Sequence, residues 1–176
     1  MSQLRYTPSY TLAEWEQWEG RWELWYGYPV AMTPSLRFDH QTICADLAFL
    51  FKLALRDKRD CQCSVAVEHD WRITDNTVVC PDLMVVCRRP KGGWVEDPPE
   101  LIVEIASPST RDNDLRGKLD IYRDEGVRHY LVIDPADRRL RRLLGPRDGD
   151  DDQSLALPLH VGCDIEIERQ LPAPPA

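Results

Sequence analysis

Residues 101–106, LIVEIA, constrain the fold more than any other stretch of the chain. Five of the six are apolar, which indicates a strand buried on both faces and therefore a sheet covered on both sides. Glu104 interrupts the run. A buried carboxylate without a partner is costly, and a shifted pKa, a charge partner or a metal usually relieves the cost. We therefore expect a positive group to meet Glu104.

The chain has 176 residues, which suits a single domain with its own core. It is 43% hydrophobic and holds six tryptophans, so it is not a disordered chain. We predict one α/β domain over residues 1–176, with a mixed central sheet flanked by helices and a frayed tail at 171–176.

Hydrophobic periodicity and turn residues place the expected elements. Thr11 and Glu14 form a capping-box pattern at the start of a short helix that ends at Gly20. Ser35 can cap a long helix to residue 57, and Gly126 ends another helix that follows the turn at 107–108. A hairpin is expected at 21–32. Further strands are expected at 63–73, 77–87, 100–106, 127–134, 138–145 and 160–168.

The chain shows no apolar run of the roughly 18 residues that a membrane span needs. The first ten residues also lack the charged and apolar regions of a signal peptide, so we expect a cytoplasmic protein. All six cysteines, at 44, 61, 63, 80, 87 and 163, are then expected to be free thiols. Cys61 and Cys63 are close in sequence, but no second pair follows at zinc-finger spacing, so the spacing does not favour zinc.

Charge argues weakly against general nucleic-acid binding, because the formal net charge is −8. The distribution of charged residues along the chain weakens this argument. Four aspartates fall at 148–152, whereas basic residues gather at 88–91 and 138–142. A local basic strip, or a carboxylate cluster that needs a cation, is compatible with the composition.

Asp82 follows Pro81, at or near the start of a strand, and Glu104 lies 22 residues later in another strand. If the two strands are neighbours with matching faces, the carboxylates lie close together and need a cation such as Mg²⁺ or Mn²⁺. Alternatively, Asp82 ends a strand in solvent and Glu104 faces an arginine. Lys118, on the following helix, could reach both acids, or it could pair on the surface with Asp114, four residues earlier.

The motif PD at 81–82, followed by ELIVEIASPST and DNDLRGKLDIYRDEGVRHYLVIDP, resembles a bacterial restriction endonuclease family within the PD-(D/E)XK nuclease superfamily. WELWYGYPVAM and His40 resemble the N-terminal part of that family, so the likeness covers about residues 8–165. It implies a restriction-endonuclease-like core and Mg²⁺-dependent hydrolysis of phosphodiester bonds. Ala106 stands where the superfamily motif has its lysine, so the resemblance implies that Lys118 replaces it from the helix.

The resemblance also implies a role for each site residue. Asp82 and Glu104 would hold the metal, with Glu23 completing its shell, and Lys118 would orient or deprotonate the attacking water. Glu23 could instead be an exposed strand residue, and His40 a capping or packing residue. Glu68 is a weaker candidate that alternation places toward solvent. Two further residues, Arg111 and Arg116, could touch phosphates or could be ordinary surface arginines.

Three functions fit these observations. The first is a metal-dependent DNA endonuclease, for which a homodimer is plausible because a double-strand cut generally needs two sites. The second is a catalytically silent nuclease fold that binds DNA or protein, and the third is a hydrolase of small phosphoesters. Metal titration separates an enzyme from a silent module, and cleavage of long substrates separates a nuclease from a small-molecule hydrolase.

Overall fold

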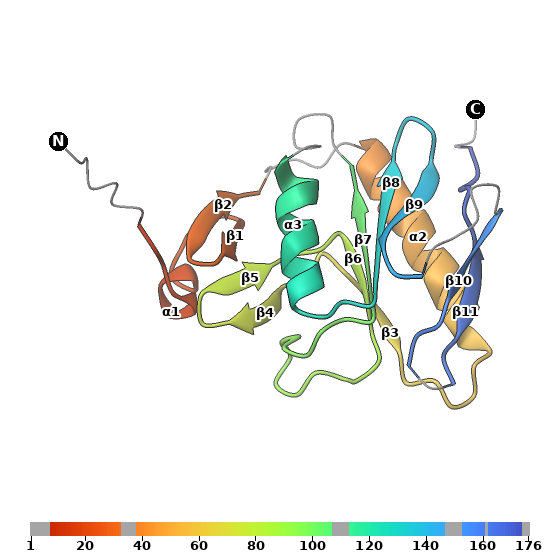
Figure 1. Ribbon diagram of the computed structural model, residues 1–176, viewed down its shortest axis with the longest axis horizontal. Coiled ribbons are helices and arrows are strands. Elements are labelled where there is room, and N and C mark those ends of the chain that lie inside the picture. The colour runs from red at the N-terminus through yellow and green to blue at the C-terminus, as the bar shows by residue number, and fades with distance from the viewer. Residues whose placement is uncertain (1–7, 33–37, 107–112, 147–152, 161, 174–176) are drawn as a thin grey trace.

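The computed structural model describes residues 8–32, 38–106, 113–146, 153–160 and 162–173, and of residues 113–115 only the backbone. The central strand is β7 (Leu101–Ile105), and all of its residues are buried, as predicted. It is the middle strand of a five-stranded sheet with the order β3-β6-β7-β8-β9 (Figure 1). The other four strands are β3 (Ser64–Val67), β6 (Leu83–Val86), β8 (His129–Asp134) and β9 (Arg139–Leu144).

The sheet is mixed because its connections differ. β7 pairs antiparallel with β6, but it pairs parallel with β8. A parallel pair needs a crossover, and helix α3 (Asn113–Asp124) provides it. The predicted strand–helix–strand unit and mixed α/β sheet are therefore present.

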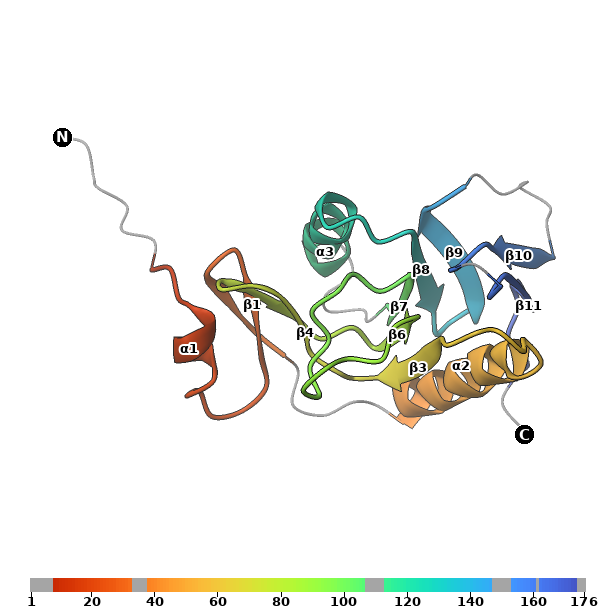
Figure 2. The ribbon, with the colours of Figure 1, turned by 90° about the horizontal axis from the view of Figure 1, so that it is seen from below.

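Helices cover both faces of this sheet, as the apolar composition of β7 requires. Leu101, Val103 and Ile105 pack in a core with helix α2 (Phe38–Arg56). Ile102 and Ala106 belong to a second core on the side of α3. Figure 2 shows the two helices on opposite sides of the sheet. Because side chains alternate along a strand, Glu104 belongs to the α3 side.

A smaller four-stranded sheet with the order β2-β1-β5-β4 adjoins the N-terminal region. Its strands are β1 (Trp22–Trp25), β2 (Tyr28–Ala31), β4 (Trp71–Thr74) and β5 (Thr77–Val79). The hairpin β1–β2 is the one expected around Gly27. Helix α1 (Leu12–Trp15) has the predicted capping box between Thr11 and Glu14, but it ends well before Gly20.

Two expected strands are each divided between the two sheets. The stretch 63–73 forms β3 and β4, and the stretch 77–87 forms β5 and β6. The first break lies at Glu68, whose φ of 47° cannot continue a strand. The second lies at residues 80–82, where Pro81 can give no backbone hydrogen bond to a sheet. The expectation of one continuous strand at each place was wrong.

The C-terminal part forms a hairpin of which only one strand was expected. β10 (Ser154–Leu157) pairs antiparallel with β11 (Ile165–Glu168) and was not predicted. Leu155, Leu157 and Leu171 are buried in the core on the α2 side, so Leu171 is not part of a frayed tail. The predicted cap Ser35, the turn at 107–108 and the aspartates at 148–152 lie outside the described residues.

Four of the six cysteines form disulfides, Cys61–Cys163 and Cys63–Cys87, so the prediction of six free thiols was wrong for these four. It failed because it rested on compartment alone, whereas folding brings these pairs together. The other two, Cys44 and Cys80, are free as expected, and both are buried. No helix within the described residues is both long and apolar enough to cross a membrane.

Candidate active site

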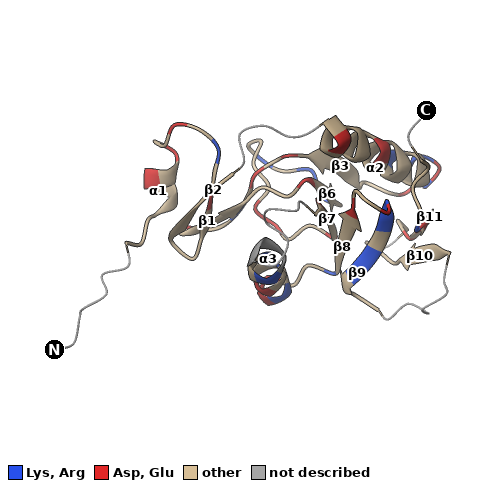
Figure 3. Ribbon diagram, turned by 90° about the horizontal axis from the view of Figure 1, so that it is seen from above, with Lys and Arg blue, Asp and Glu red and all other residues tan. Residues whose placement is uncertain are grey.

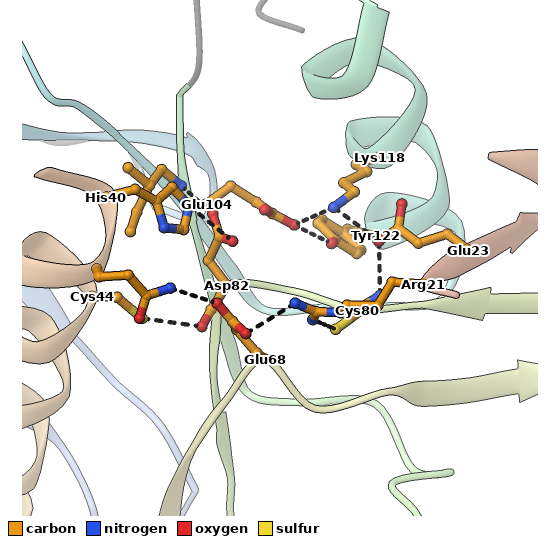
Figure 4. A network of polar contacts seen from close by, with 12 residues as sticks. Arg21, Glu23, His40, Cys44, Glu68, Cys80, Asp82, Glu104, Lys118 and Tyr122 are labelled. Atoms are coloured by element: carbon orange, nitrogen blue, oxygen red, sulfur yellow. Dashed lines mark hydrogen bonds and ion pairs between the residues drawn. The ribbon is translucent and has the colours of Figure 1, made fainter. Parts of the chain in front are cut away.

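The positive group that Glu104 requires is Lys118. The lysine comes from the buried face of α3, and its Nζ lies 2.9 Å from Glu104 Oε1. Tyr122, one turn further along the same helix, donates its hydroxyl to the same oxygen at 2.7 Å. Lys118 therefore points to Glu104, as predicted, and all three side chains are buried (Figure 4).

Glu23 approaches the same lysine from the smaller sheet. Its Oε1 lies 3.0 Å from Lys118 Nζ and accepts the backbone N–H of Cys80 at 2.8 Å. Its Oε2 accepts the indole N–H of Trp25 at 3.0 Å. Only 3% of Glu23 is exposed, which excludes the exposed strand glutamate that the sequence also allowed. The ammonium group of Lys118 thus lies between two carboxylates.

Asp82 lies at the same end of the sheet because β6 and β7 are neighbours. Leu83 pairs with Val103, so Asp82 stands beside the C-terminal part of β7. Its Oδ2 accepts the backbone N–H of Ile105, the residue after Glu104, at 2.7 Å. The expected adjacency of the strands bearing Asp82 and Glu104 is therefore present.

His40, on the first turn of α2, contacts Asp82 from the other face of the sheet. Its Nε2 lies 3.2 Å from Asp82 Oδ1. Both side chains are largely buried, with 13% and 16% of their surface exposed. His40 is therefore a direct partner of a candidate metal ligand, and neither a capping nor a simple packing residue.

Glu68 lies beside this group, although alternation had placed it toward solvent. The break in the strand at Glu68 changes the direction of its side chain, and its backbone N–H donates to the carbonyl of Asp82 at 3.1 Å. Its carboxylate binds Arg21 and Gln41, each at 3.1 Å. Figure 4 shows Glu68 and Arg21 next to Asp82. Glu68 thus supports the loop that presents Asp82.

The remaining candidates are Arg116 and Arg111. Arg116 is exposed on α3, and Arg111 lies outside the described residues, as does the side chain of Asp114. Conversely, the cluster contains Tyr122, which was not among the predicted site residues. Its spacing of four residues from Lys118 on one helix was the signal that could have identified it.

Burial and like charge govern the ionisation of Glu104. Burial raises the pKa of Glu104 to about 8; Lys118 opposes the shift, and the carboxylates of Asp82 and Glu23 add to it. For Lys118, burial alone would lower the pKa. The carboxylates of Glu104, Glu23 and Asp82 outweigh burial and raise the pKa of Lys118 well above its ordinary value. The lysine is therefore held in its charged form.

Asp82 and His40 stabilise each other's charged forms. Burial favours the neutral carboxyl, but the hydrogen bond and charge of His40 outweigh it and lower the pKa of Asp82. Burial likewise opposes the imidazolium, and the hydrogen bond to Asp82 outweighs it and raises the pKa of His40. These interactions therefore favour the ionised form of Asp82.

Three carboxylates, Glu23, Asp82 and Glu104, thus share the cluster with one ammonium group and one imidazole. When all three acids are ionised, negative charge exceeds positive charge even with His40 protonated. A divalent cation with oxygen ligands would offset this excess of negative charge and would favour the ionised form of Glu104. The excess of negative charge is the feature of this cluster that a cation could offset.

Comparison with known proteins agrees with the fold. A crystal structure described as a putative nuclease belonging to DUF820, from Anabaena variabilis, matches with a TM-score of 0.66 and 16% sequence identity. The match covers 87% of this chain and 90% of that chain, and it shows a shared fold. A search of the curated proteins gave no significant match. The family model "Uma2: Putative restriction endonuclease" matches residues 10–167, and the chain therefore belongs to this family.

Proposed function

We propose that the protein is a metal-dependent endonuclease that hydrolyses phosphodiester bonds in DNA. One observation supports this most strongly: Glu23 and Glu104 both pair with the charged Lys118, and Asp82 is bound beside Glu104, at the backbone N–H of Ile105. An oxygen-rich, negatively charged cluster with an adjacent ammonium group suits the hydrolysis of an anionic phosphodiester.

The proposed metal ligands are Asp82 and Glu104, with Glu23 completing the site. Both hydrogen bonds to Glu104 fall on Oε1, so Oε2 is the oxygen that we expect to bind a cation. Mg²⁺ or Mn²⁺ bound there would polarise the phosphate and lower the pKa of a bound water. Each ligand is held by groups of the chain itself, which limits its movement: Ile105 and His40 hold Asp82, Cys80 and Trp25 hold Glu23, and Lys118 and Tyr122 hold Glu104.

Lys118 is proposed to orient the attacking water and to offset negative charge in the transition state. Its raised pKa keeps it protonated at neutral pH, which favours these roles over proton abstraction. Ala106, at the usual lysine position, belongs to the core on the α3 side. Its small side chain leaves this face of the sheet open to a lysine from the helix. His40 is proposed as a positioning residue that fixes Asp82 and favours its ionised form.

DNA binding would have to use local basic residues on an acidic protein. Figure 3 shows a basic stretch along β9, but Arg138 is paired with Asp46 and Arg141 with Asp137. Arg116 is exposed on the helix that carries Lys118, so it is the better candidate for a phosphate contact. We also propose Arg111 for this role, although it lies outside the described residues.

A double-strand cut generally needs two such sites, so we propose that the chain acts as a homodimer. We also propose that the enzyme acts in the cytoplasm, on intracellular DNA. Sedimentation of the protein with and without a short DNA duplex would measure its oligomeric state. One chain per complex, together with double-strand cutting, would contradict the dimer.

The proposal is tested by nicking of supercoiled plasmid in Mg²⁺, in Mn²⁺ and in EDTA. We predict that Lys118→Met keeps metal binding but loses about 10²–10⁴-fold in rate, because it removes a charge that acts on the reacting phosphate. Asp82→Asn and Glu104→Gln should lose metal affinity and rate together. Arg123→Met is the matched control, since Arg123 is an exposed cation on the same helix.

Two results would overturn the proposal. One is cleavage by Lys118→Met at the parental rate. The other is the absence of any Mg²⁺- or Mn²⁺-dependent cleavage of supercoiled, linear or single-stranded DNA by the parental protein. Metal binding without cleavage would favour a catalytically silent module, in which the buried Lys118 pairs serve the fold alone.

A further inference from the structure

Four cysteines from three separate segments meet at the opposite end of the large sheet from Asp82. Cys61 and Cys63 precede β3, Cys87 follows β6, and Cys163 precedes β11. Asp82 and Cys87 are separated by strand β6, whose residues rise about 3.3 Å each. The cysteine cluster is therefore separate from the candidate active site.

The sulfurs of this cluster occupy one small volume. Those of Cys61, Cys63 and Cys163 all lie within 4.8 Å of one another, and Cys87 is bonded to Cys63. Four thiolates around Zn²⁺, each about 2.3 Å from the metal, would lie about 3.8 Å apart in a tetrahedron. Once the disulfides are reduced, the sulfurs of Cys61, Cys63 and Cys163 are already close to this spacing, and Cys87, held beside Cys63, would complete the set.

A backbone N–H in the cluster also donates to a cysteine sulfur, which would stabilise negative charge on that sulfur. The N–H of Cys63 donates to Sγ of Cys61 at 3.4 Å. A backbone donor of this kind stabilises a thiolate, which is the form that binds a metal. Cys87 and Cys163 are buried, while Cys61 and Cys63 are partly exposed, so an ion could enter from the side of the α2–β3 loop.

We propose that Cys61, Cys63, Cys87 and Cys163 bind one Zn²⁺ when reduced, and that the two disulfides are the oxidised form of the same site. Reduction takes four electrons and four protons, which two molecules of a dithiol supply as each closes its own disulfide. Zinc binding then displaces the four thiol protons. Because all four ligands come from the protein, the site is closed and structural.

In either form the cluster ties the α2–β3 loop and the β10–β11 hairpin to the end of β6. β10 and β11 contribute Leu155, Leu157, Ile165 and Ile167 to the core on the α2 side. A structural zinc ion adds its binding free energy to folding. The zinc form would therefore hold this hairpin in place under reducing conditions, where disulfides would not.

The test starts from parental protein reduced with a phosphine, exchanged into metal-free buffer and titrated with Zn²⁺ or Co²⁺. We expect about one metal ion per chain after removal of the excess, and a cobalt spectrum with the intense absorption of tetrahedral thiolate coordination. Oxidised protein should give no thiolate absorption with Co²⁺, because any ion that it binds would then lie at the carboxylates. Adding an oxidant to the zinc form should release the metal as the Cys61–Cys163 and Cys63–Cys87 bridges form, which peptide mapping would identify.

Variants separate this site from other metal binding. Cys87→Ser and Cys163→Ser should lose stoichiometric zinc, while Cys44→Ala, which removes a buried thiol outside the cluster, should keep it. Asp82→Asn should also keep zinc, so failure of the nuclease proposal would not affect this one. Zinc content far below one ion per reduced parental chain would overturn the inference. So would a cobalt spectrum without thiolate character, and both measurements are independent of whether the serine variants fold.

Discussion

Glu104→Gln gives the sharpest test of the view that the cluster carries too much negative charge without a metal. Glutamine keeps an acceptor for Lys118 and Tyr122 but cannot ionise, so it mimics the protonated form of Glu104. The pKa of Glu104 is raised from 4.5 to about 8 in the folded protein. The folded state therefore binds more protons than the unfolded state between these values, and stability falls as pH rises through this window.

The expected difference in the free energy of unfolding between Glu104→Gln and the parent follows from the pKa shift of Glu104. It grows by about 1.4 kcal/mol for each pH unit above the unfolded pKa. In metal-free buffer the variant should equal the parent near pH 4.5. It should exceed the parent by about 1 kcal/mol at pH 5 and by at most about 3 kcal/mol at pH 7, and the difference should level off above pH 8. Taking the difference between the two proteins cancels the titrations of groups that do not sense the charge of Glu104.

The measurement is urea unfolding followed by tryptophan fluorescence in EDTA from pH 5 to pH 9. Glu168→Gln, at an exposed position on β11, is the matched control and should show no such trend. Adding Mg²⁺ or Mn²⁺ should stabilise the parent by mass action and leave Glu104→Gln nearly unchanged, which narrows the difference. A difference between variant and parent that is constant from pH 5 to pH 8 would show that ionised Glu104 costs nothing, and would refute the reasoning.

Two further predictions concern groups around the cluster. Gly117→Ala should lower the free energy of unfolding by about 1–3 kcal/mol, despite the better helix propensity of alanine, because its Cβ would lie 2.6 Å from Cζ3 of Trp25. Cleavage should fall as well, since Lys118 is the next residue; urea unfolding and nicking rates measure both effects, and an Ala variant as stable as the parent would contradict the contact. His40→Asn should destabilise the metal-free protein most below about pH 6.5. The raised pKa of His40 means that its contribution is complete there and is lost as pH rises through the folded value, so a cost that grows with pH would contradict the pairing with Asp82.

Local hydrophobic periodicity was sufficient to predict most elements of the fold. The doubly buried β7, the long α2, the amphipathic α3 and the hairpin around Gly27 all follow from patterns within about ten neighbouring residues. The breaks at Glu68 and Pro81 were missed because the alternation of apolar residues continues through them. A positive φ at a glutamate is set by the surrounding structure and has no signature in the sequence.

The candidate site was predictable to the extent that its residues interrupt an apolar pattern. Glu104 and Lys118 could be paired because strand and helix follow each other directly, and a crossover helix packs on its own strand. Glu68 was misjudged, because alternation alone placed it toward solvent, and Tyr122 was not recognised as a site residue. The four-cysteine cluster was not foreseen, because spacing in the sequence separates Cys87 and Cys163 widely from the 61–63 pair.

The sequence by itself determined that a buried acid needed a positive partner, because the cost of burying charge depends on residue type and apolar context. Only the tertiary structure decided which groups meet that need. Glu23 and His40 reach the cluster because the small sheet and α2 pack against the two sides of the central sheet. Such contacts depend on the packing of whole elements, which joins residues far apart in the chain and leaves no local pattern at either one.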